Sequence, residues 1–252
     1  MFLDRILQHK AEEIAELTAS RRRFSTALKR SGLSVIGEIK RASPSKGVID
    51  GGVDPLRRLR LYERGGADAV SILTDRAFFG GGPEDFRCLR TRTELPLLRK
   101  DFLVSEVQIY ESLFLGADAL LLIAAALEKE RLEALLSLTY ALGMEAIVEV
   151  HTGEELYAVL ETDAPILGIN NRDLSTFAVD LRTTARLMDV LRSAEGEGSR
   201  IVVAESGVGG EEDAGYLAET GVDAILVGEA LMRASDPEEL LRSFKKKGRR
   251  AA

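Results

Sequence analysis

Eight short apolar runs alternate along this chain with longer amphipathic segments. The runs are rich in Val, Ile and Leu, and each is bounded by Gly, Pro, Asp or Asn. They cover residues 35–40, 69–75, 95–101, 119–125, 144–150, 166–171, 200–206 and 224–229. Nearly continuous apolar strands of this length are typical of parallel sheets that are buried on both faces.

The segments between the runs have helical periodicity. We expect helices over residues 55–65, 105–115, 128–142, 153–160, 181–194 and 211–220. Three of them end in a related phrase, Gly-Ala-Asp-Ala at residues 66–69 and 116–119 and Gly-Val-Asp-Ala at residues 221–224, in which Gly closes the helix and a strand follows at once. Each interval leaves room for one crossover helix.

Eight strand–helix units in 252 residues predict an α/β fold, a (β/α)8 TIM barrel, in one domain over residues 1–252. A dinucleotide-binding sheet is less favoured, because no Gly-x-Gly-x-x-Gly follows the first strand. Residues 1–33 are expected to be an N-terminal helical extension, since Leu3, Ile6, Leu7, Ile14 and Leu17 have approximate helical spacing.

The composition excludes several classes of protein. A formal charge of −7 argues against a nucleic-acid surface. A single cysteine, Cys88, cannot form an internal disulfide and is expected to be buried, and two histidines cannot build a usual zinc site. With no secretory signal and no run long enough to cross a membrane, we expect a cytoplasmic monomer with no metal, no nucleic-acid partner and no membrane partner.

Charged or polar residues recur where the predicted strands end. The set is Glu38, Lys40, Lys100, Asp101, Glu149, Asn170, Arg172, Glu205 and Ser206. Any one of them could simply mark the point where its strand leaves the core. In a barrel, however, these strand ends surround one pocket, so the set as a whole indicates a functional site. Glu38 and Lys40 are two residues apart and should share one face of the first strand.

Three loops indicate an anion site. Residues 41–47 follow the first strand with hydroxyl and small side chains, although a plain Ser-Pro turn explains that segment better when it is taken alone. Residues 205–210 and 227–232 follow the seventh and eighth strands, which is the recurrent phosphate site of such barrels. We therefore expect a phosphorylated small-molecule substrate. Phe78 and Phe79 could line a site for a flat ring or serve as packing anchors, and His9 and His151 are expected to have surface or packing roles.

Several of these segments resemble the signatures of indole-3-glycerol phosphate synthases. They are residues 38–47, 71–75 with 78–81, 98–102, 168–174, 204–207 and 226–232, which follow one another in the family's order. The resemblance extends from the N-terminal helix to about Met232. It implies ring closure of 1-(2-carboxyphenylamino)-1-deoxyribulose 5-phosphate to indole-3-glycerol phosphate, with loss of carbon dioxide and water and with no cofactor.

The resemblance also implies roles for individual residues. Lys100 would be the general acid that protonates the substrate carbonyl, and Glu149 would transfer a proton during loss of water. Glu38 and Lys40 would support charge and proton movement at the same centre. Crowding of Lys40, Lys100 and Arg172 would lower the pKa of Lys100, whereas Glu38, Glu149 and Glu205 would raise it, so the sequence does not decide the net direction.

The remaining implied roles concern binding. Lys40 and Arg172 would hold the substrate carboxylate, while Asn170 and Glu205 would contact hydroxyl groups or orient the lysines. The phosphate would be bound by Ser43, Ser206, Gly207, Gly228 and Glu229, and the ring would be lined by Phe79, Phe102 and Leu121.

The chain departs from the family's pattern at two places. Glu229 stands where some members carry Ser; a carboxylate would repel phosphate, so we expect Glu229 to offer its backbone N–H and to turn its side chain away. The segment over residues 17–33 is shorter than is common, which puts closure of the barrel mouth and substrate contact from residues 21–24 in doubt.

Two other kinds of function remain open on the sequence alone. One is a different phosphate-binding barrel enzyme, either an isomerase or an aldolase that forms a Schiff base through Lys40 or Lys100. The other is a non-catalytic barrel that only binds a ligand. The complete set of pocket charges argues against the second, because buried charges are costly to keep.

Overall fold

Eight parallel strands close into a barrel in the computed structural model, which describes residues 5–10, 23–29, 32–173 and 175–247. In chain order the strands are β1 (Ser34–Ile39), β4 (Ala69–Leu73), β5 (Leu97–Lys100), β6 (Ala119–Ile123), β7 (Glu145–Val150), β8 (Ile166–Asn170), β9 (Ile201–Glu205) and β10 (Ala224–Val227). β10 pairs with β1 and closes the ring. The predicted barrel is therefore confirmed. Short strands β2 (Ala42–Ser43) and β3 (Gly47–Val48) form a separate antiparallel pair after β1.

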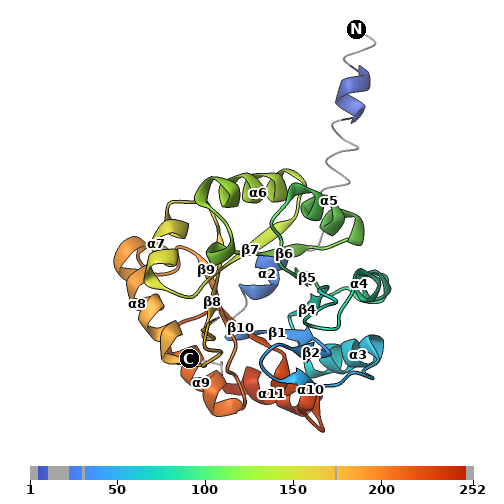
Figure 1. Cartoon of the computed structure of the whole chain (residues 1–252), viewed down its shortest axis with the longest axis vertical. Coiled ribbons are helices and arrows are strands. Elements are labelled where there is room, and N and C mark those ends of the chain that lie inside the picture. The colour runs from blue at the N-terminus through green and yellow to red at the C-terminus, as the bar shows by residue number, and fades with distance from the viewer. Residues whose placement is uncertain (1–4, 11–22, 30–31, 174, 248–252) are drawn as a thin grey trace.

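Helices lie around the outside of the ring (Figure 1). They are α3 (Pro55–Gly65), α4 (Pro83–Arg90), α5 (Glu106–Leu115), α6 (Lys129–Ala141), α7 (Gly153–Leu160), α8 (Arg182–Glu195), α9 (Glu211–Glu219), α10 (Glu229–Arg233) and α11 (Pro237–Lys247), with a 3-10 turn η1 (Ala124–Ala126) after β6. The six helices predicted between the strands are all present, and their ends differ from the prediction by no more than one residue. The structure also contains α4, α10 and α11.

The repeated helix-to-strand phrase joins neighbouring strands at the N-terminal end of the barrel. Gly66 ends α3 in the left-handed region, at φ 85°, which glycine adopts without strain. Two residues later, the Asp68 carboxylate accepts a hydrogen bond from the backbone N–H of Val35 at 2.9 Å. Asp118 and Asp223 bond to the starts of β5 and β9 in the same way, at 2.8 Å each. A short sequence repeat thus fixes the positions of three strand pairs.

The alternation of side chains divides the core into two parts. Ile36, Leu98 and Val203 point into the barrel, whereas Val35 and Val70 point outward against the helices, and all five are buried. The two-residue period of a strand produces this division.

Cys88 is exposed, contrary to the expected burial, because α4 turns Phe86 and Leu89 toward the core instead.

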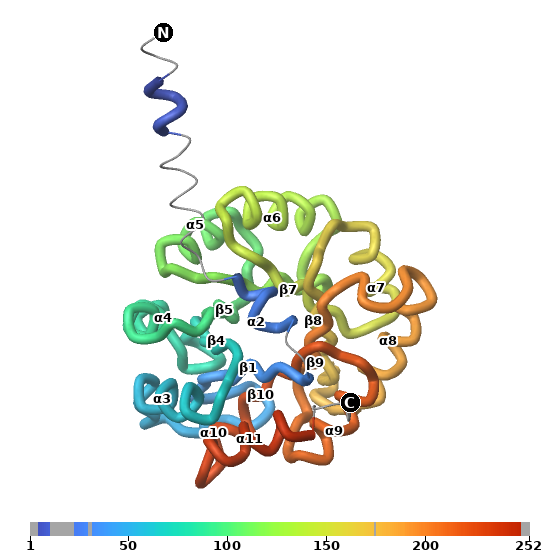
Figure 2. Tube along the Cα trace, turned by 180° about the vertical axis from the view of Figure 1, so that it is seen from behind, coloured from blue at the N-terminus to red at the C-terminus, as the bar shows by residue number. Residues whose placement is uncertain are grey.

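A short helix, α2 (Phe24–Leu28), closes the N-terminal end of the barrel (Figure 2). Phe24 and Leu28 are fully buried among the first inward-facing residues of the strands. The Ser25 N–H donates to the Glu145 carboxylate at 3.0 Å. Phe24 therefore lies at the end opposite the strand C-termini, and the substrate contact from this residue that the sequence left in doubt is not possible there.

Only part of the predicted N-terminal extension can be assessed. Residues 5–10 are helical and exposed, whereas most of the predicted helix over residues 3–17, together with residues 21 and 22, lies outside the described residues. Among the described residues, no helix combines the length and apolar character needed to cross a bilayer.

The barrel plug leads to a stability prediction. Phe24→Ala should lower the free energy of unfolding by about 3–5 kcal/mol, because it leaves a cavity among rigid strand ends. Phe114→Ala is the matched control: this side chain is 81% exposed on α5, so its loss should change stability by no more than about 0.5 kcal/mol. Chemical denaturation of both variants measures the difference, and similar small losses would contradict the plug.

Candidate active site

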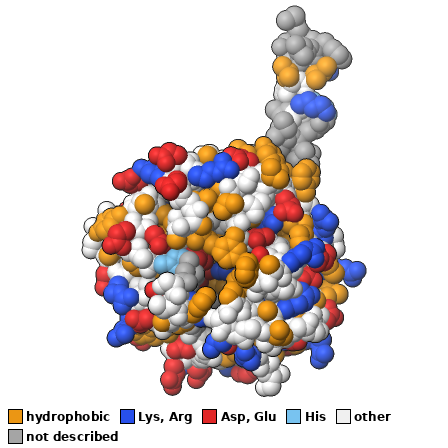
Figure 3. All heavy atoms as spheres, in the orientation of Figure 1, with side chains coloured by type: hydrophobic (Ala, Val, Ile, Leu, Met, Phe, Trp, Pro, Cys, Tyr) orange, Lys and Arg blue, Asp and Glu red, His pale blue; other side chains and the backbone are white. Residues whose placement is uncertain are grey.

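A cavity of about 660 Å³ opens at the C-terminal ends of the strands. Every residue that the sequence assigned to catalysis or binding lines this cavity: Glu38, Lys40, Ser43, Phe79, Lys100, Phe102, Leu121, Glu149, Asn170, Arg172, Glu205, Ser206, Gly207, Gly228 and Glu229. Figure 3 shows the molecule hollowed at the centre of this face, with hydrophobic side chains along part of the rim. The barrel thus brings together side chains that lie up to about 190 residues apart in the sequence.

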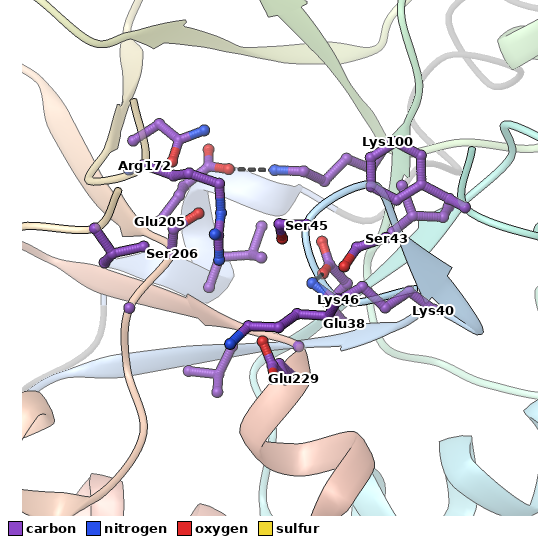
Figure 4. A pocket seen from close by; sticks show the side chains of 18 of the residues that line it. Glu38, Lys40, Ser43, Ser45, Lys46, Lys100, Arg172, Glu205, Ser206 and Glu229 are labelled. Atoms are coloured by element: carbon purple, nitrogen blue, oxygen red, sulfur yellow. Dashed lines mark hydrogen bonds and ion pairs between the residues drawn. The ribbon is translucent and has the colours of Figure 1, made fainter. Parts of the chain in front are cut away.

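The polar floor of the cavity consists of inward-facing residues one layer above the apolar interior. Lys100 lies between two carboxylates: its Nζ contacts Glu205 closely and lies 3.5 Å from Oε2 of Glu149. Figure 4 shows Lys100 directed at Glu205, with Arg172 and Ser43 bordering the cavity on opposite sides. Asn170 donates from Nδ2 to Oε1 of Glu149 at 3.1 Å. A second ion pair joins Lys40 to Glu38 at 2.8 Å.

The two carboxylates beside Lys100 have opposite pKa shifts. Burial by itself raises the pKa of Glu149. Lys100 and other neighbours lower it by more than burial raises it, so that the pKa is about 2. For Glu205, burial raises the pKa and the nearby Glu149 adds to this, so that it reaches about 7 despite Lys100. Oε1 of Glu205 is buried with no hydrogen-bond partner in the described part of the chain. One carboxylate is therefore ionised at neutral pH, while the other can hold a proton.

The pKa values of Lys100 and of Glu38 on β1 depend on the same network of charges. Burial lowers the pKa of Lys100, but Glu205, Glu149 and Glu38 together raise it well above its usual range. Burial raises the pKa of Glu38, yet Lys40 and Lys100 shift it below its usual value. The carboxylates therefore outweigh the effect of burial in the free protein, and the net shift of the Lys100 pKa, which the sequence left open, is upward.

Arg99 holds the end of β5 in place, a role that was not predicted from the sequence. Its side chain points outward from the barrel, is buried, and donates to the Ser112 hydroxyl of α5 at 3.1 Å. It also pairs with Asp101 at 3.0 Å, and Asp101 in turn contacts Thr74. These bonds hold the backbone on both sides of Lys100. The sequence signal for this role was an arginine inside a predicted buried strand, directly before the pocket lysine.

The loop after β9 has a constrained backbone. Ser206 and Gly207 both have positive φ, at 65° and 91°. Asn171 stabilises this turn by donating to the carbonyl oxygens of Glu205 and Ser206, at 3.1 and 3.2 Å. A non-glycine residue at positive φ is costly and is often found at functional sites. The turn places Ser206 and Gly207 on the cavity wall.

Gly228 and Glu229 border the cavity where α10 begins. The Glu229 carboxylate lies 3.2 Å from Nε of Arg233, one turn along the helix. This pairing partly neutralises a negative charge that would otherwise face an anion. Arg233 and Lys46 also line the cavity and were not assigned as site residues, although Lys46 lies within the loop that suggested an anion site.

One side of the cavity is apolar. Phe79 and Phe102 have ring centroids 6.2 Å apart in a tilted arrangement, and Leu121 is buried beside them in the wall. Phe78 is 63% exposed and does not line the cavity, so only one member of the Phe-Phe pair faces it. A flat ring with a polar end would fit between this wall and the charged floor.

Two glycines leave room for the charged groups. A Cβ atom on Gly228 would lie 3.0 Å from Nζ of Lys40 and closer still to Glu38. On Gly168 it would overlap Glu205 and lie 2.8 Å from Ile147 Cγ2. Neither glycine has positive φ, so close approach explains their presence better than backbone freedom.

Comparison with known proteins identifies related chains. A family model described as indole-3-glycerol phosphate synthase matches residues 3–244. The indole-3-glycerol phosphate synthase of Petrotoga mobilis is 46% identical over 94% of both chains. Indole-3-glycerol phosphate synthase 2 of Streptomyces coelicolor is 51% identical over 90% of this chain and 86% of its own.

The fold is also found in more distant solved structures. A thiamine phosphate pyrophosphorylase from Pyrococcus furiosus superposes with a TM-score of 0.62 at 18% identity, covering 87% of this chain and 96% of its own. This likeness concerns the fold alone.

Within the described residues, no group of three or more His, Cys, Asp or Glu side chains is arranged to hold a metal ion.

The close approach at Gly168 gives a second prediction. Gly168→Ala should lower the free energy of unfolding by about 1–3 kcal/mol, because the added methyl group displaces Glu205 or Ile147 in a rigid barrel. Gly153→Ala is the control, since a Cβ atom there meets nothing within 4 Å at the start of α7. It should leave stability unchanged or raise it by up to about 1 kcal/mol. Urea denaturation distinguishes the two, and equal stability would refute the crowding.

Proposed function

Because the chain belongs to the indole-3-glycerol phosphate synthase family, and is therefore a carboxy-lyase of tryptophan biosynthesis, we propose that the cavity closes the indole ring. The substrate would be 1-(2-carboxyphenylamino)-1-deoxyribulose 5-phosphate, a phosphorylated small molecule. The observation that carries this proposal is the position of Lys100 between two buried carboxylates, within reach of an apolar wall on one side and an anion site on the other.

The walls of the cavity suggest how the substrate lies. Its phosphate would be held by the Ser43 and Ser206 side chains and by backbone N–H groups of Gly207, Gly228 and Glu229. Its aromatic ring would contact Phe79, Phe102 and Leu121. The ring carboxylate would meet Lys40 and Arg172 until it leaves as carbon dioxide. This orientation places the sugar-derived carbonyl above Lys100, Asn170 and Glu205.

Ring closure needs an acid at the carbonyl oxygen. The aromatic carbon attacks the carbonyl carbon, and the Lys100 ammonium gives its proton to the oxygen, which becomes a hydroxyl group. The raised pKa of Lys100 ensures that the ammonium is protonated when substrate arrives. A protonated Glu205 makes Lys100 a stronger acid than an ionised Glu205 does, because it withdraws one negative charge from the ammonium.

The later steps need a base. Departure of carbon dioxide leaves its bonding electrons with the ring system, and loss of water then requires one proton to leave a carbon and one to reach the departing hydroxyl. Glu149, whose pKa lies at about 2, is ionised and able to accept the first of these. Glu38 and Lys40 would balance charge at the same centre, in keeping with their ion pair.

The broader description of the protein is also part of the proposal. We infer one barrel domain over residues 1–252 with residues 1–33 as its N-terminal helical extension, acting as a cytoplasmic monomer without cofactor, metal, nucleic-acid partner or membrane partner. An isomerase, a Schiff-base aldolase or a non-catalytic ligand-binding barrel are the alternatives. The paired carboxylates around Lys100 favour proton transfer over Schiff-base chemistry, because they keep the amine protonated and hence non-nucleophilic.

Replacement of the proposed acid is the direct test. Lys100→Ala should lower kcat by at least about 100-fold, as expected for loss of a general acid, measured by the rise of indole absorbance and fluorescence from the carboxyphenylamino substrate. Lys129→Ala is the control, because Lys129 pairs with Glu161 on the outer surface. No turnover by the folded wild type, or trapping of substrate on Lys100 by borohydride, would instead support one of the alternatives.

The raised pKa of Glu205 predicts a pH effect. As pH rises through about 7, Glu205 loses its proton and makes Lys100 a weaker acid, so kcat/KM should fall. Glu205→Gln keeps the site's shape without this ionisation, and its profile should have no inflection near pH 7. The assay is kcat/KM for the same substrate between pH 5 and 9. An unchanged inflection in the variant would assign it to another group.

A further inference from the structure

His151 lies next to the proposed catalytic base but has no role in the reaction described above. It is two residues beyond Glu149 and immediately follows β7, so both side chains lie on the same face of the chain. Its Nε2 lies 3.2 Å from Oε1 of Glu149, and only 9% of its side chain is exposed. The sequence suggested a surface or packing role for this residue, and neither explains an imidazole ring against a buried carboxylate.

Glu155, in the first turn of α7, holds the other side of the ring. Its Oε2 lies 3.2 Å from Nδ1 of His151 and also accepts the His151 backbone N–H at 2.7 Å. The Glu155 N–H in turn donates to the Thr152 hydroxyl at 3.2 Å, which caps the helix. Two contacts with His151 thus hold the Glu155 carboxylate, the cap bond holds its backbone, and together they fix the orientation of the imidazole ring.

The contacts of Glu149 divide its two oxygens between different neighbours. Oε1 accepts a hydrogen bond from Asn170 and contacts His151, whereas Oε2 faces Lys100 at 3.5 Å. The contact of His151 Nε2 with Oε1 is an ion pair and does not meet the geometry of a hydrogen bond, so its effect on Oε1 is mainly electrostatic. One oxygen is therefore held in place, and the other is presented to the reacting centre.

The charge on His151 follows from the groups around it. Among the described residues, the ionisable side chains in contact with it are Glu149 on β7 and Glu155 on α7. Burial lowers the pKa of the imidazole, but these two carboxylates raise it more, to about 9. Beyond Glu149 lie Lys100 on β5 and, past Lys100, Glu205 on β9. At neutral pH a cation therefore stands behind the carboxylate that the reaction needs in ionised form.

We propose that His151, anchored by Glu155, is a positioning residue that orients the Glu149 carboxylate and keeps it ionised. This inference rests on the proposed role of Glu149 as the base. His151 does not touch the reacting atoms, because Glu149 lies between it and Lys100. Its loss should therefore affect the proton-transfer step, seen in kcat, more than substrate binding, seen in KM.

The test compares His151→Ala, His151→Gln and Glu155→Gln from pH 3 to 9, a range that extends down toward the low pKa of Glu149. We expect kcat to fall at least about tenfold in His151→Ala with KM changed less than about threefold, and the acidic limb of the kcat profile to move to higher pH, because loss of the cation raises the pKa of Glu149. His151→Gln should restore part of kcat but not the position of the acidic limb, since an amide can hold Glu149 without a positive charge.

Glu155→Gln provides a variant that keeps the size of the side chain and leaves His151 in place. It should lower the pKa of the imidazole, so that the alkaline fall in kcat begins at a lower pH than in the wild type. Glu154→Gln is the matched control, because Glu154 is the adjacent acidic residue in the same helical turn and is exposed. It should leave both kcat and the pH profile unchanged.

The outcomes separate the inference from the function on which it rests. If Glu149→Gln is inactive while His151→Ala and Glu155→Gln keep wild-type kcat and pH profiles, the positioning role is wrong and the base is not. If Glu149→Gln itself keeps wild-type kcat, the proposed role of Glu149 fails first. Far-ultraviolet circular dichroism and urea denaturation of each variant confirm that it is folded before its kinetics are compared.

Discussion

The alternation of side chains in a closed parallel barrel is the constraint on which the rest of this structure depends. Once Ile36, Leu98 and Val203 point inward to fill the barrel, the residues two positions further along their strands must also point inward. Those residues are Glu38, Lys100 and Glu205. The packing of the core therefore places these charged side chains together at one end of the barrel, where we propose the reaction centre.

Burying these charges together makes them interdependent. Lys100 contacts two carboxylates, and a single ammonium cannot fully compensate both in a poorly solvated cavity. The result is one carboxylate, Glu149, that stays ionised next to a second carboxyl group, Glu205, that can retain its proton near neutral pH. Two side chains of the same type thus acquire different pKa values from their surroundings, and the His151 cation on the far side of Glu149 increases the difference.

The contacts that stabilise the barrel and the proposed active site lie at opposite ends of it. At the N-terminal end, Asp68, Asp118 and Asp223 bond to neighbouring strand starts and α2 fills the opening. At the C-terminal end, the backbone accepts unfavourable conformations such as that of Ser206, and Oε1 of Glu205 is left without a partner among the described residues. The rigid N-terminal end allows these local costs to persist at the mouth, where we propose that they serve binding and proton transfer.

The sequence by itself determined the barrel, the helix boundaries and the set of residues around the cavity, because periodicity and strand-end charges are local signals that this fold converts into position. It did not determine the role of Arg99, the exposure of Cys88, the burial of Phe24 at the closed end or the contact of His151 with Glu149. Each of these depends on which neighbours meet in space. The direction of the pKa shift of Lys100 was also undecided, since it is the sum of burial, which lowers the pKa, and of three carboxylates, which raise it and whose distances exist only in the folded chain.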